Sequence, residues 1–261
     1  MRRREFLAVS GAMGVWPLAQ TVSEAQQPRG HQRDYYELRT YQLETQEQRK
    51  AFDRFAADAA IPALNRLGIS PVGVFYPLEG IGPAYVLLTH PSPESVATLT
   101  ERLANDDEFL QRGAAWLDAP ATRPAYQRME SSLFVAFTGM PHLETPAESP
   151  DRVFQLRIYE SPSVKTGQKK IEMFNDAGEI AIFRRVGLNP VFFGEALVGS
   201  KMPNLTYMLG FESDEDRAAA WKRFGADPQW QELRAMEEYA DKKILSGITN
   251  LMLQPATYSQ I

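Results

Sequence analysis

Apolar and polar residues alternate with a period of two in two short stretches of the chain, Tyr36–Tyr41 and Phe154–Tyr159, whose sequences nearly repeat each other. A β-strand directs successive side chains to opposite faces, so Leu38 and Leu156 would occupy equivalent faces. The opposite faces would carry two Arg–Tyr pairs, Arg39 with Tyr41 and Arg157 with Tyr159. The stretches lie roughly 120 residues apart, the size of a small domain, which predicts one structural unit present twice.

The residues between the two repeated strands predict the rest of the first unit. Apolar residues at helical spacing follow an N-cap at Thr45 and stop at Gly68, and Pro62 is expected to kink this helix. A hairpin, a second helical region and a last strand follow, each marked by turn-forming or capping residues. The hairpin strands are Pro71–Tyr76 and Ala84–His90, the helical pieces begin at Ser92 and Asp106, and the last strand is Ser131–Thr138.

The order β, α, β, β, α, β returns in the second unit. The run Ile180–Pro190 matches Ile61–Pro71 and keeps the end of the helix and the start of the strand. The remaining elements are a hairpin at Val191–Gly194 and Leu205–Phe211, helical pieces capped by Ser213 and Asp227, and a strand at Gly247–Gln254. Residues 139–150 contain three prolines, too many for an element interior, and indicate a linker between the units.

This order of elements predicts the fold class. A βαββαβ unit forms a four-stranded antiparallel sheet with both helices on one face, the ferredoxin-like arrangement. The other face of the sheet needs a cover, and two units in one chain can supply it by packing sheet on sheet. We therefore expect an α+β protein in which tandem ferredoxin-like domains, residues 35–138 and 151–261, pack as an intrachain dimeric α/β barrel.

The N-terminal residues are typical of an export signal. Arg3-Arg4 precede Phe6-Leu7, an apolar run extends over residues 8–18, and a small-x-Ala sequence ends at Ala25. This resembles a twin-arginine signal peptide over residues 1–25, cleaved after Ala25 and followed by a disordered leader at 26–34. The mature protein would be periplasmic or secreted. A retained anchor is the alternative, but the apolar run is well short of the ~20 residues that span a bilayer.

Composition narrows the classes of partner and cofactor. The 261 residues are 44% hydrophobic and 23% charged, with a net charge of −5 and no cysteine. An acidic chain without basic runs is poorly suited to nucleic acid, and disulfides and thiolate metal sites are excluded. The three histidines, His31, His90 and His142, lack metal-ligand spacing, and no phosphate-binding or hydrolase motif occurs. We expect no cofactor; His90 is expected on the surface, with haem ligation or base catalysis as its alternative roles.

Several runs of residues resemble the NIPSNAP family. They are the strand openings at 37–41 and 155–159, Asn204–Tyr207, Asp216-Arg217 and Asp227–Trp230. The resemblance covers roughly residues 35–258 and implies the dimeric α/β-barrel fold, often with two such domains in one chain. In the first unit, Asn105–Phe109 stands where the family shows Asp-Pro-x-Trp. The family has no agreed catalytic residues, so the resemblance implies little chemistry.

The two Arg–Tyr pairs are the candidate ligand site. Arg39, Tyr41, Arg157 and Tyr159 could hold a carboxylate or enolate-like ligand if they faced the barrel interior. The structural alternative pairs each Arg with a neighbouring carboxylate such as Glu37 and buries each Tyr as core. We expect an exported small-molecule-binding or accessory protein that takes its ligand in the barrel interior or between sheet and helices. A cofactor-independent monooxygenase or haem-degrading enzyme is the alternative, a partner-docking module is a third, and further oligomerisation stays open.

Overall fold

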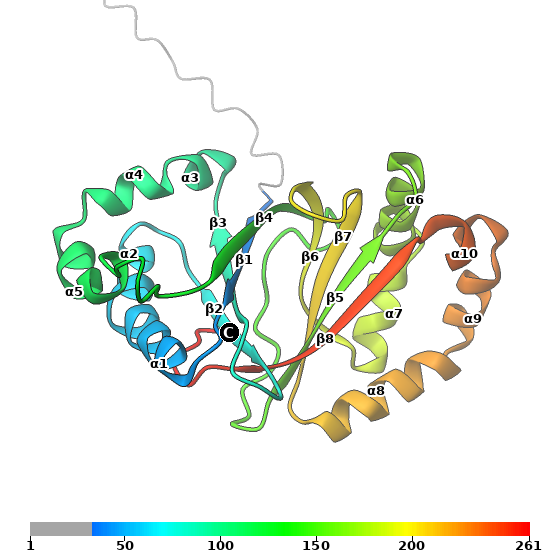
Figure 1. The fold of residues 1–261 in the computed structure, drawn as a ribbon. Helices are drawn as coiled ribbons and strands as arrows, with labels where there is room; N and C mark the ends of the chain where they lie inside the picture. The colour runs from blue at the N-terminus through cyan, green and yellow to red at the C-terminus, as the bar shows by residue number, and fades with distance from the viewer. Residues whose placement is uncertain (1–32) are drawn as a thin grey trace, which may run out of the picture. The chain divides into compact units, whose positions relative to one another are not determined.

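A computed structural model describes residues 33–261, so the predicted signal peptide at 1–25 and most of the predicted leader lie outside the described residues. The first half contains four strands and a set of helices (Figure 1). The strands are β1 (Tyr35–Gln42), β2 (Val72–Pro77), β3 (Ala84–His90) and β4 (Arg128–Ala136). The helices are α1 (Gln46–Phe55), the π-helix η1 (Ala56–Ala60), α2 (Ile61–Arg66), α3 (Pro93–Ala97), α4 (Leu99–Ala104) and α5 (Asp107–Leu117).

The second half repeats this order with its own strands and helices. The strands are β5 (Val153–Glu160), β6 (Asn189–Val198), β7 (Asn204–Phe211) and β8 (Gly247–Pro255). The helices are α6 (Val164–Asn175), α7 (Glu179–Val186), α8 (Asp214–Ala226), α9 (Pro228–Ala235), the 3-10 helix η2 (Glu237–Tyr239) and α10 (Asp241–Ile244). Within residues 33–261, none of the helices is long and apolar enough to cross a bilayer.

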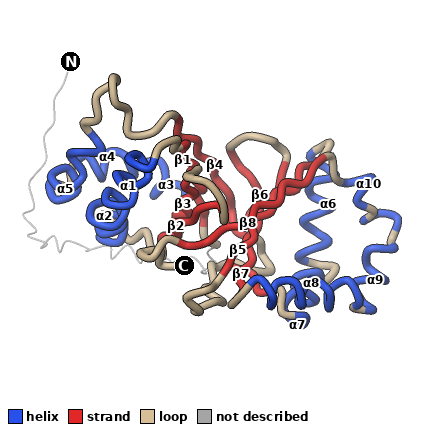
Figure 2. The backbone as a smooth tube through the Cα atoms, turned by 60° about the horizontal axis from the view of Figure 1, so that its bottom comes forward, coloured by secondary structure: helices blue, strands red, loops and turns tan. Residues whose placement is uncertain are grey.

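The strands close into one eight-stranded barrel in the order β1-β3-β2-β8-β5-β7-β6-β4. The pairs β2·β8 and β4·β6 join the two halves, and every pairing is antiparallel. Helices α1–α5 lie on one side of the barrel and α6–α10 on the other (Figures 1 and 2). The predicted packing of one sheet against the other inside a single chain is confirmed as a closed barrel.

Short-range sequence signals set the helix ends as expected. The predicted N-caps accept a hydrogen bond from the backbone N–H three residues later; they are Thr45, Ser92, Asp106, Ser213 and Asp227. Gly68 and Gly187 end equivalent helices with φ of 77° and 84°, backbone angles that disfavour other residues. The repeated helix stop therefore reflects one backbone geometry used twice.

The helix interrupted by Pro62 contains a π-helical turn. Proline lacks a backbone N–H, and in an α-helix its ring meets the carbonyl of the residue four positions earlier, here Asp58. Asp58 lies inside η1, the π-helix Ala56–Ala60 that directly precedes α2. The predicted kink is thus accommodated by a locally widened turn, a feature found frequently at functional sites.

The barrel interior is filled mainly from one end. The core residues there include four rings, those of Tyr36, Phe75, Phe154 and Phe192, each at most 1% exposed. Phe75 and Phe154 come from different halves and pack with ring centroids 4.9 Å apart. An eight-stranded barrel is just wide enough for side chains to fill it, so these rings close that end.

Segments flanking the first half are also packed. Asp34, in the predicted leader, bonds the chain at Pro141 and Leu143, so it belongs to the folded part. Residues 139–150 form no helix or strand, as expected of the proline-rich segment. Met140 and Ala147 within it are nevertheless buried, and Glu144 N–H donates to Val191 C=O at 2.9 Å. The connection therefore lies against the barrel.

Candidate functional site

The first half contains a cavity of about 450 Å³ between its sheet and its helices. Its floor is formed by the strands β1, β2 and β3, and its walls by α1, η1, α2, α4 and α5. Most lining side chains are apolar or aromatic, and Arg39 supplies the charge. Leu110, Leu117 and Met129 line the cavity and are each more than 40% exposed, which places them at its mouth.

The two Arg–Tyr pairs face the helices and not the barrel interior. Tyr41 packs in the core cluster formed with the first set of helices, and Tyr159 in the cluster formed with the second. Leu38 and Leu156, on the opposite faces of the same strands, point into the barrel. The expectation that these pairs line the barrel interior is therefore wrong, because the leucines occupy that face. The structure places the pairs in two separate layers, one in each half.

Arg39 is held on the cavity floor by a carboxylate of its own strand. Its Nε and Nη2 donate to the two carboxylate oxygens of Glu37 at 2.7 and 2.9 Å, a bidentate pair. Only 20% of the Arg39 side chain and 7% of the Glu37 side chain are exposed. Burial opposes the charge on Arg39, but Glu37 outweighs it and raises the pKa of the guanidinium. The pairing that the structural interpretation predicted for Arg39 is confirmed.

Glu37 in turn sits at the centre of a buried polar network. Ser131 Oγ donates to Glu37 Oε1 at 2.6 Å, and His90 Nε2 lies 3.4 Å from Glu37 Oε2. His90 Nδ1 lies 3.0 Å from Ser95 Oγ. Burial alone would raise the pKa of Glu37, but His90, Arg39 and Ser131 together lower it to about 2. The carboxylate is ionised at neutral pH and fixes the orientation of Arg39.

His90 is not the surface residue that its place before a proline turn predicted. Its side chain is completely buried within the Glu37 network. The strand β3 ends at His90 and α3 begins at Pro93, so Ser95 in the first turn of this helix lies against the His90 ring. His90 does not line the cavity, which leaves it without direct access to a ligand there.

Tyr41 lines the cavity beside Arg39 and packs against several aromatic rings. Its ring lies 5.1 Å from Phe52, 5.4 Å from Tyr126 and 6.2 Å from Trp116. Trp116 also stacks on Phe55 at 5.2 Å with an interplanar angle of 11°. Burial raises the pKa of Tyr41, and the neighbouring Arg39 opposes this shift only in part, so the phenol is neutral. The floor therefore presents a guanidinium and a phenol beneath flat apolar surfaces.

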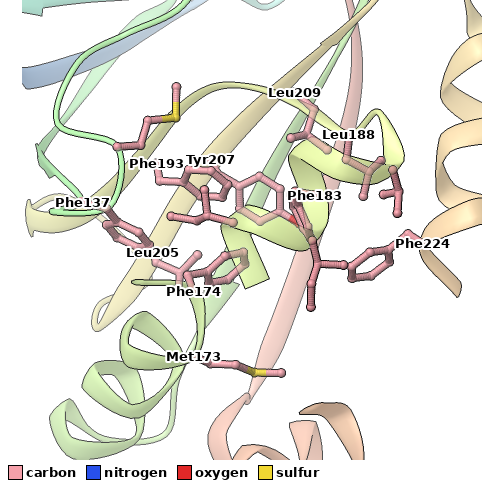
Figure 3. Packing of buried hydrophobic residues seen from close by; sticks show 14 of the residues in the cluster. Phe137, Met173, Phe174, Phe183, Leu188, Phe193, Leu205, Tyr207, Leu209 and Phe224 are labelled. Atoms are coloured by element: carbon pink, nitrogen blue, oxygen red, sulfur yellow. The ribbon is translucent and has the colours of Figure 1, made fainter. Parts of the chain in front are cut away.

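The corresponding layer of the second half is filled by aromatic rings. In the first half Arg39 lies opposite Val86, which pairs with Val74; in the second, Arg157 lies opposite Tyr207, which pairs with Phe193. Phe193 and Tyr207 are completely buried and pack around Phe174 and Phe183 (Figure 3). Two valines thus line a cavity where two rings fill the matching space.

Arg157 and Tyr159 are built into this packed layer. Tyr159 and Tyr207 share a hydrogen bond of 3.0 Å between their hydroxyls, and Arg157 lies over the Trp221 ring at 4.9 Å. Gln155, which occupies the position of Glu37, bonds Asn250 and Trp221. Arg157 consequently has no carboxylate two positions earlier on its strand, where Arg39 has Glu37, and its buried Nε makes no hydrogen bond within residues 33–261. The Arg157–Tyr159 pair is therefore enclosed in the packed layer of the second half.

The sequence predicted Arg39 and Tyr41 as site residues and the space between sheet and helices as one of two places for a ligand, but not that this space is open in the first half. The departure from the family pattern at Asn105–Phe109 lies in the same half as the open space. The clue in the sequence is the size of residues at equivalent positions of the two halves. Val74 and Val86 stand where the second half has Phe193 and Tyr207, and residues 56 and 60 of the cavity lining are alanines. The described residues contain no cluster of three or more His, Asp or Glu that could hold a metal ion.

Comparison with solved structures supports the fold. A protein from Lactobacillus acidophilus named a putative monooxygenase aligns with a TM-score of 0.57 over 85% of this chain and 94% of its own, at 9% identity. An anthrone oxidase-like protein aligns with a TM-score of 0.53 over 87% and 92%, at 10% identity. At such identities the likeness concerns the fold alone.

A protein-family model, and not a solved structure, supplies the family. A NIPSNAP-like domain protein from Burkholderia xenovorans is 24% identical and covers 42% of this chain and 90% of its own, with a TM-score of 0.36. A comparison with curated proteins finds no match. The NIPSNAP family profile matches twice, over residues 36–137 and 154–260, which together span most of the barrel and its helices. With both halves matched, this chain belongs to the NIPSNAP family.

Proposed function

We propose that the first half binds a small, neutral and largely apolar molecule in the cavity above Arg39. The proposal rests on a difference between the two halves. The same arrangement of strands and helices encloses large side chains in one half and small side chains in the other. Rings occupy the second layer, while Val74, Val86, Ala56 and Ala60 leave the first open. Protein interiors are close-packed, and a hollow of this size forfeits contacts that a ligand can restore.

The charge on the floor favours a neutral ligand. Glu37 is ionised and bonded to Arg39 through two nitrogens, so the pair carries no net charge. An anionic ligand would have to compete with this carboxylate for the guanidinium in a poorly solvated site. A phenolic or carbonyl oxygen needs only a donor, and the guanidinium has five N–H groups, of which Glu37 engages one on Nε and one on Nη2. The proposal thus replaces the carboxylate ligand expected from the sequence.

Size and lining agree with this ligand class. Small-molecule pockets occupy ≈ 300–1,000 Å³ and combine apolar walls with a few polar groups, and the cavity of about 450 Å³ falls in that range. The lining includes aromatic side chains that can pack against a planar molecule, namely Phe52, Phe55, Trp116 and Tyr126. A one- or two-ring aromatic compound with a single hydroxyl or carbonyl oxygen is the best fit.

Titration calorimetry with a matched pair of probes tests the proposal. 1-Naphthol carries a neutral hydroxyl and 1-naphthoate a carboxylate on the same ring system, so they separate charge from shape. We expect saturable binding of 1-naphthol, weaker binding of 1-naphthoate, and loss of both in Val86→Phe, which places a ring where the second half has Tyr207. The control Val198→Phe alters an exposed valine elsewhere. Equal binding by Val86→Phe and the wild-type protein would refute the proposed site.

Catalysis is the second candidate function. One fold neighbour is named a putative monooxygenase and another an anthrone oxidase-like protein, and a phenol held beside Arg39 and Tyr41 would be a suitable substrate. The enzyme hypothesis requires oxygen consumption and a new product when the protein and a phenolic compound are mixed in air. Binding without turnover would leave the protein as a carrier or accessory protein.

We also propose that the chain consists of two tandem domains and is exported. Each half has the strand order of a ferredoxin-like unit, β4-β1-β3-β2 and β8-β5-β7-β6, which supports tandem domains at 35–138 and 151–261. Export through the twin-arginine pathway is proposed from residues 1–25 alone. Neither the domain boundaries nor the localisation affects the proposed ligand site.

A further inference from the structure

The barrel holds another cavity, of about 600 Å³, at the end where β1 and β5 finish. It is separate from the cavity above Arg39, because it is lined by the interior faces of the strands. Leu38 and Leu156 lie at its base, and Tyr85 lies in its wall. The rings that close the opposite end of the barrel do not extend to this one, so the interior opens here.

The walls of this cavity carry polar side chains with unused hydrogen-bonding capacity. Thr40, Gln42 and Ser132 line it, and their side chains make no hydrogen bond within residues 33–261. Thr206 behaves differently, since its hydroxyl donates to Asn204 Oδ1 at 3.1 Å. Two hydroxyls and one amide are therefore free to bind a ligand from two neighbouring strands, β1 and β4.

The β6–β7 turn lies across the same opening. Lys201, with φ of 58°, donates from Nζ to Thr249 Oγ1 on β8 at 2.8 Å. At the other side, Gly199 approaches Ser132 on β4 so closely that a Cβ would lie 2.5 Å from Ser132 Oγ. The turn thus spans from β4 to β8 and covers part of the mouth.

Charge again selects the ligand class. Lys201 Nζ lies 3.5 Å from Glu160 Oε1, which offsets its charge, and the other charged residue in the lining is Glu130. A mouth of this composition does not attract anions. We propose that it binds a small neutral polyhydroxylated molecule of monosaccharide size. Its hydroxyls would bond Thr40, Gln42 and Ser132, and its C–H face would pack on Leu38, Leu156 and Tyr85.

Chemical shifts of the backbone amides, measured by NMR while D-glucose is added to the protein, test this site. We expect saturable shifts at the amides of β1, β4 and the β6–β7 turn. Loss of one hydrogen bond in Thr40→Val or Ser132→Ala should weaken binding by about three- to tenfold, whereas Thr40→Ser keeps the hydroxyl and most of the affinity. Val86→Phe fills the other cavity and should leave glucose binding unchanged.

Three results would overturn the inference. Absence of saturable shifts at the mouth would show that the free hydroxyls serve only water. Shifts that disappear in Val86→Phe would assign glucose to the cavity of the first half. Tighter binding of inorganic phosphate, lost in Lys201→Gly, would make the mouth an anion site. Because Val86→Phe separates the two cavities, failure here leaves the function proposed for the first half untouched.

Discussion

At the scale of single residues, the site depends on one carboxylate. Glu37 bonds Arg39 and Ser131, lies beside His90, and is 5% exposed. The sequence places Glu37 two residues before Arg39 on one strand face, so their pairing could be predicted from period-two alternation. The part played by His90 could not, since it depends on how the loop after β3 folds over the strand.

Replacement of Glu37 by Gln should destabilise the protein by about 3 kcal/mol at pH 7, because it leaves Arg39 buried without a counter-charge. Ser131→Ala removes one hydrogen bond to the same carboxylate and should cost only about 1 kcal/mol. Denaturant unfolding of both variants beside the wild-type protein measures the difference. Equal losses in the two variants would mean that the ion pair contributes no more than an ordinary hydrogen bond.

The same variant should show a pH dependence. The pKa of Glu37 is about 2 in the folded protein, below the ordinary value of 4.5. A lowered pKa stabilises the fold above the unfolded value, and this contribution is lost as pH falls from about 4.5 towards 2. The stability gap between wild type and Glu37→Gln should narrow over that window in unfolding curves. A gap that stays constant down to pH 2 would contradict an ionised Glu37.

At the scale of elements, the two halves share one arrangement of strands and helices, but the first half encloses a cavity and the second a packed core. Strand and helix positions followed from period, capping residues and the glycine stops at Gly68 and Gly187. The open space of the first half depends on the volumes that several elements bring together, which no single stretch reveals. Its clue was comparative: Val74 and Val86 stand where Phe193 and Tyr207 stand in the other copy.

Reciprocal substitutions should therefore have unequal effects on stability. Tyr207→Val opens a hollow in a packed layer and removes the hydroxyl partner of Tyr159, so we expect a loss of about 3–5 kcal/mol. Val86→Phe enters an existing cavity and should change stability by less than about 1.5 kcal/mol. Thermal unfolding of the two variants checks this. A Val86→Phe variant as unstable as Tyr207→Val would show that the first layer is already full.

At the scale of the whole molecule, the two halves cover each other. β2 pairs with β8 and β4 with β6, and the interior residues of both sheets form one core. The order of elements predicted this closure, because each sheet has an apolar face that only the other copy covers. The sequence did not predict that the barrel would be plugged at one end and open at the other.

Residues 151–261 expressed alone should form a homodimer. The isolated half would expose Phe154, Phe192, Met208 and Leu253, all at most 1% exposed in the full chain. Its edge strands β6 and β8 would be unpaired, and a second copy can pair β6 with β8 in both directions. Light scattering during gel filtration gives the mass of the species. A stable monomer would show that the sheet face does not require a cover.

Native mass spectrometry after incubation with 1-naphthol tests the central claim most directly, namely that the layer above Arg39 is a ligand site. We predict one molecule of 1-naphthol on each wild-type chain and none on Val86→Phe, with both proteins folded. The claim would be contradicted if the wild-type chain retained no probe, or if Val86→Phe retained as much as the wild-type chain.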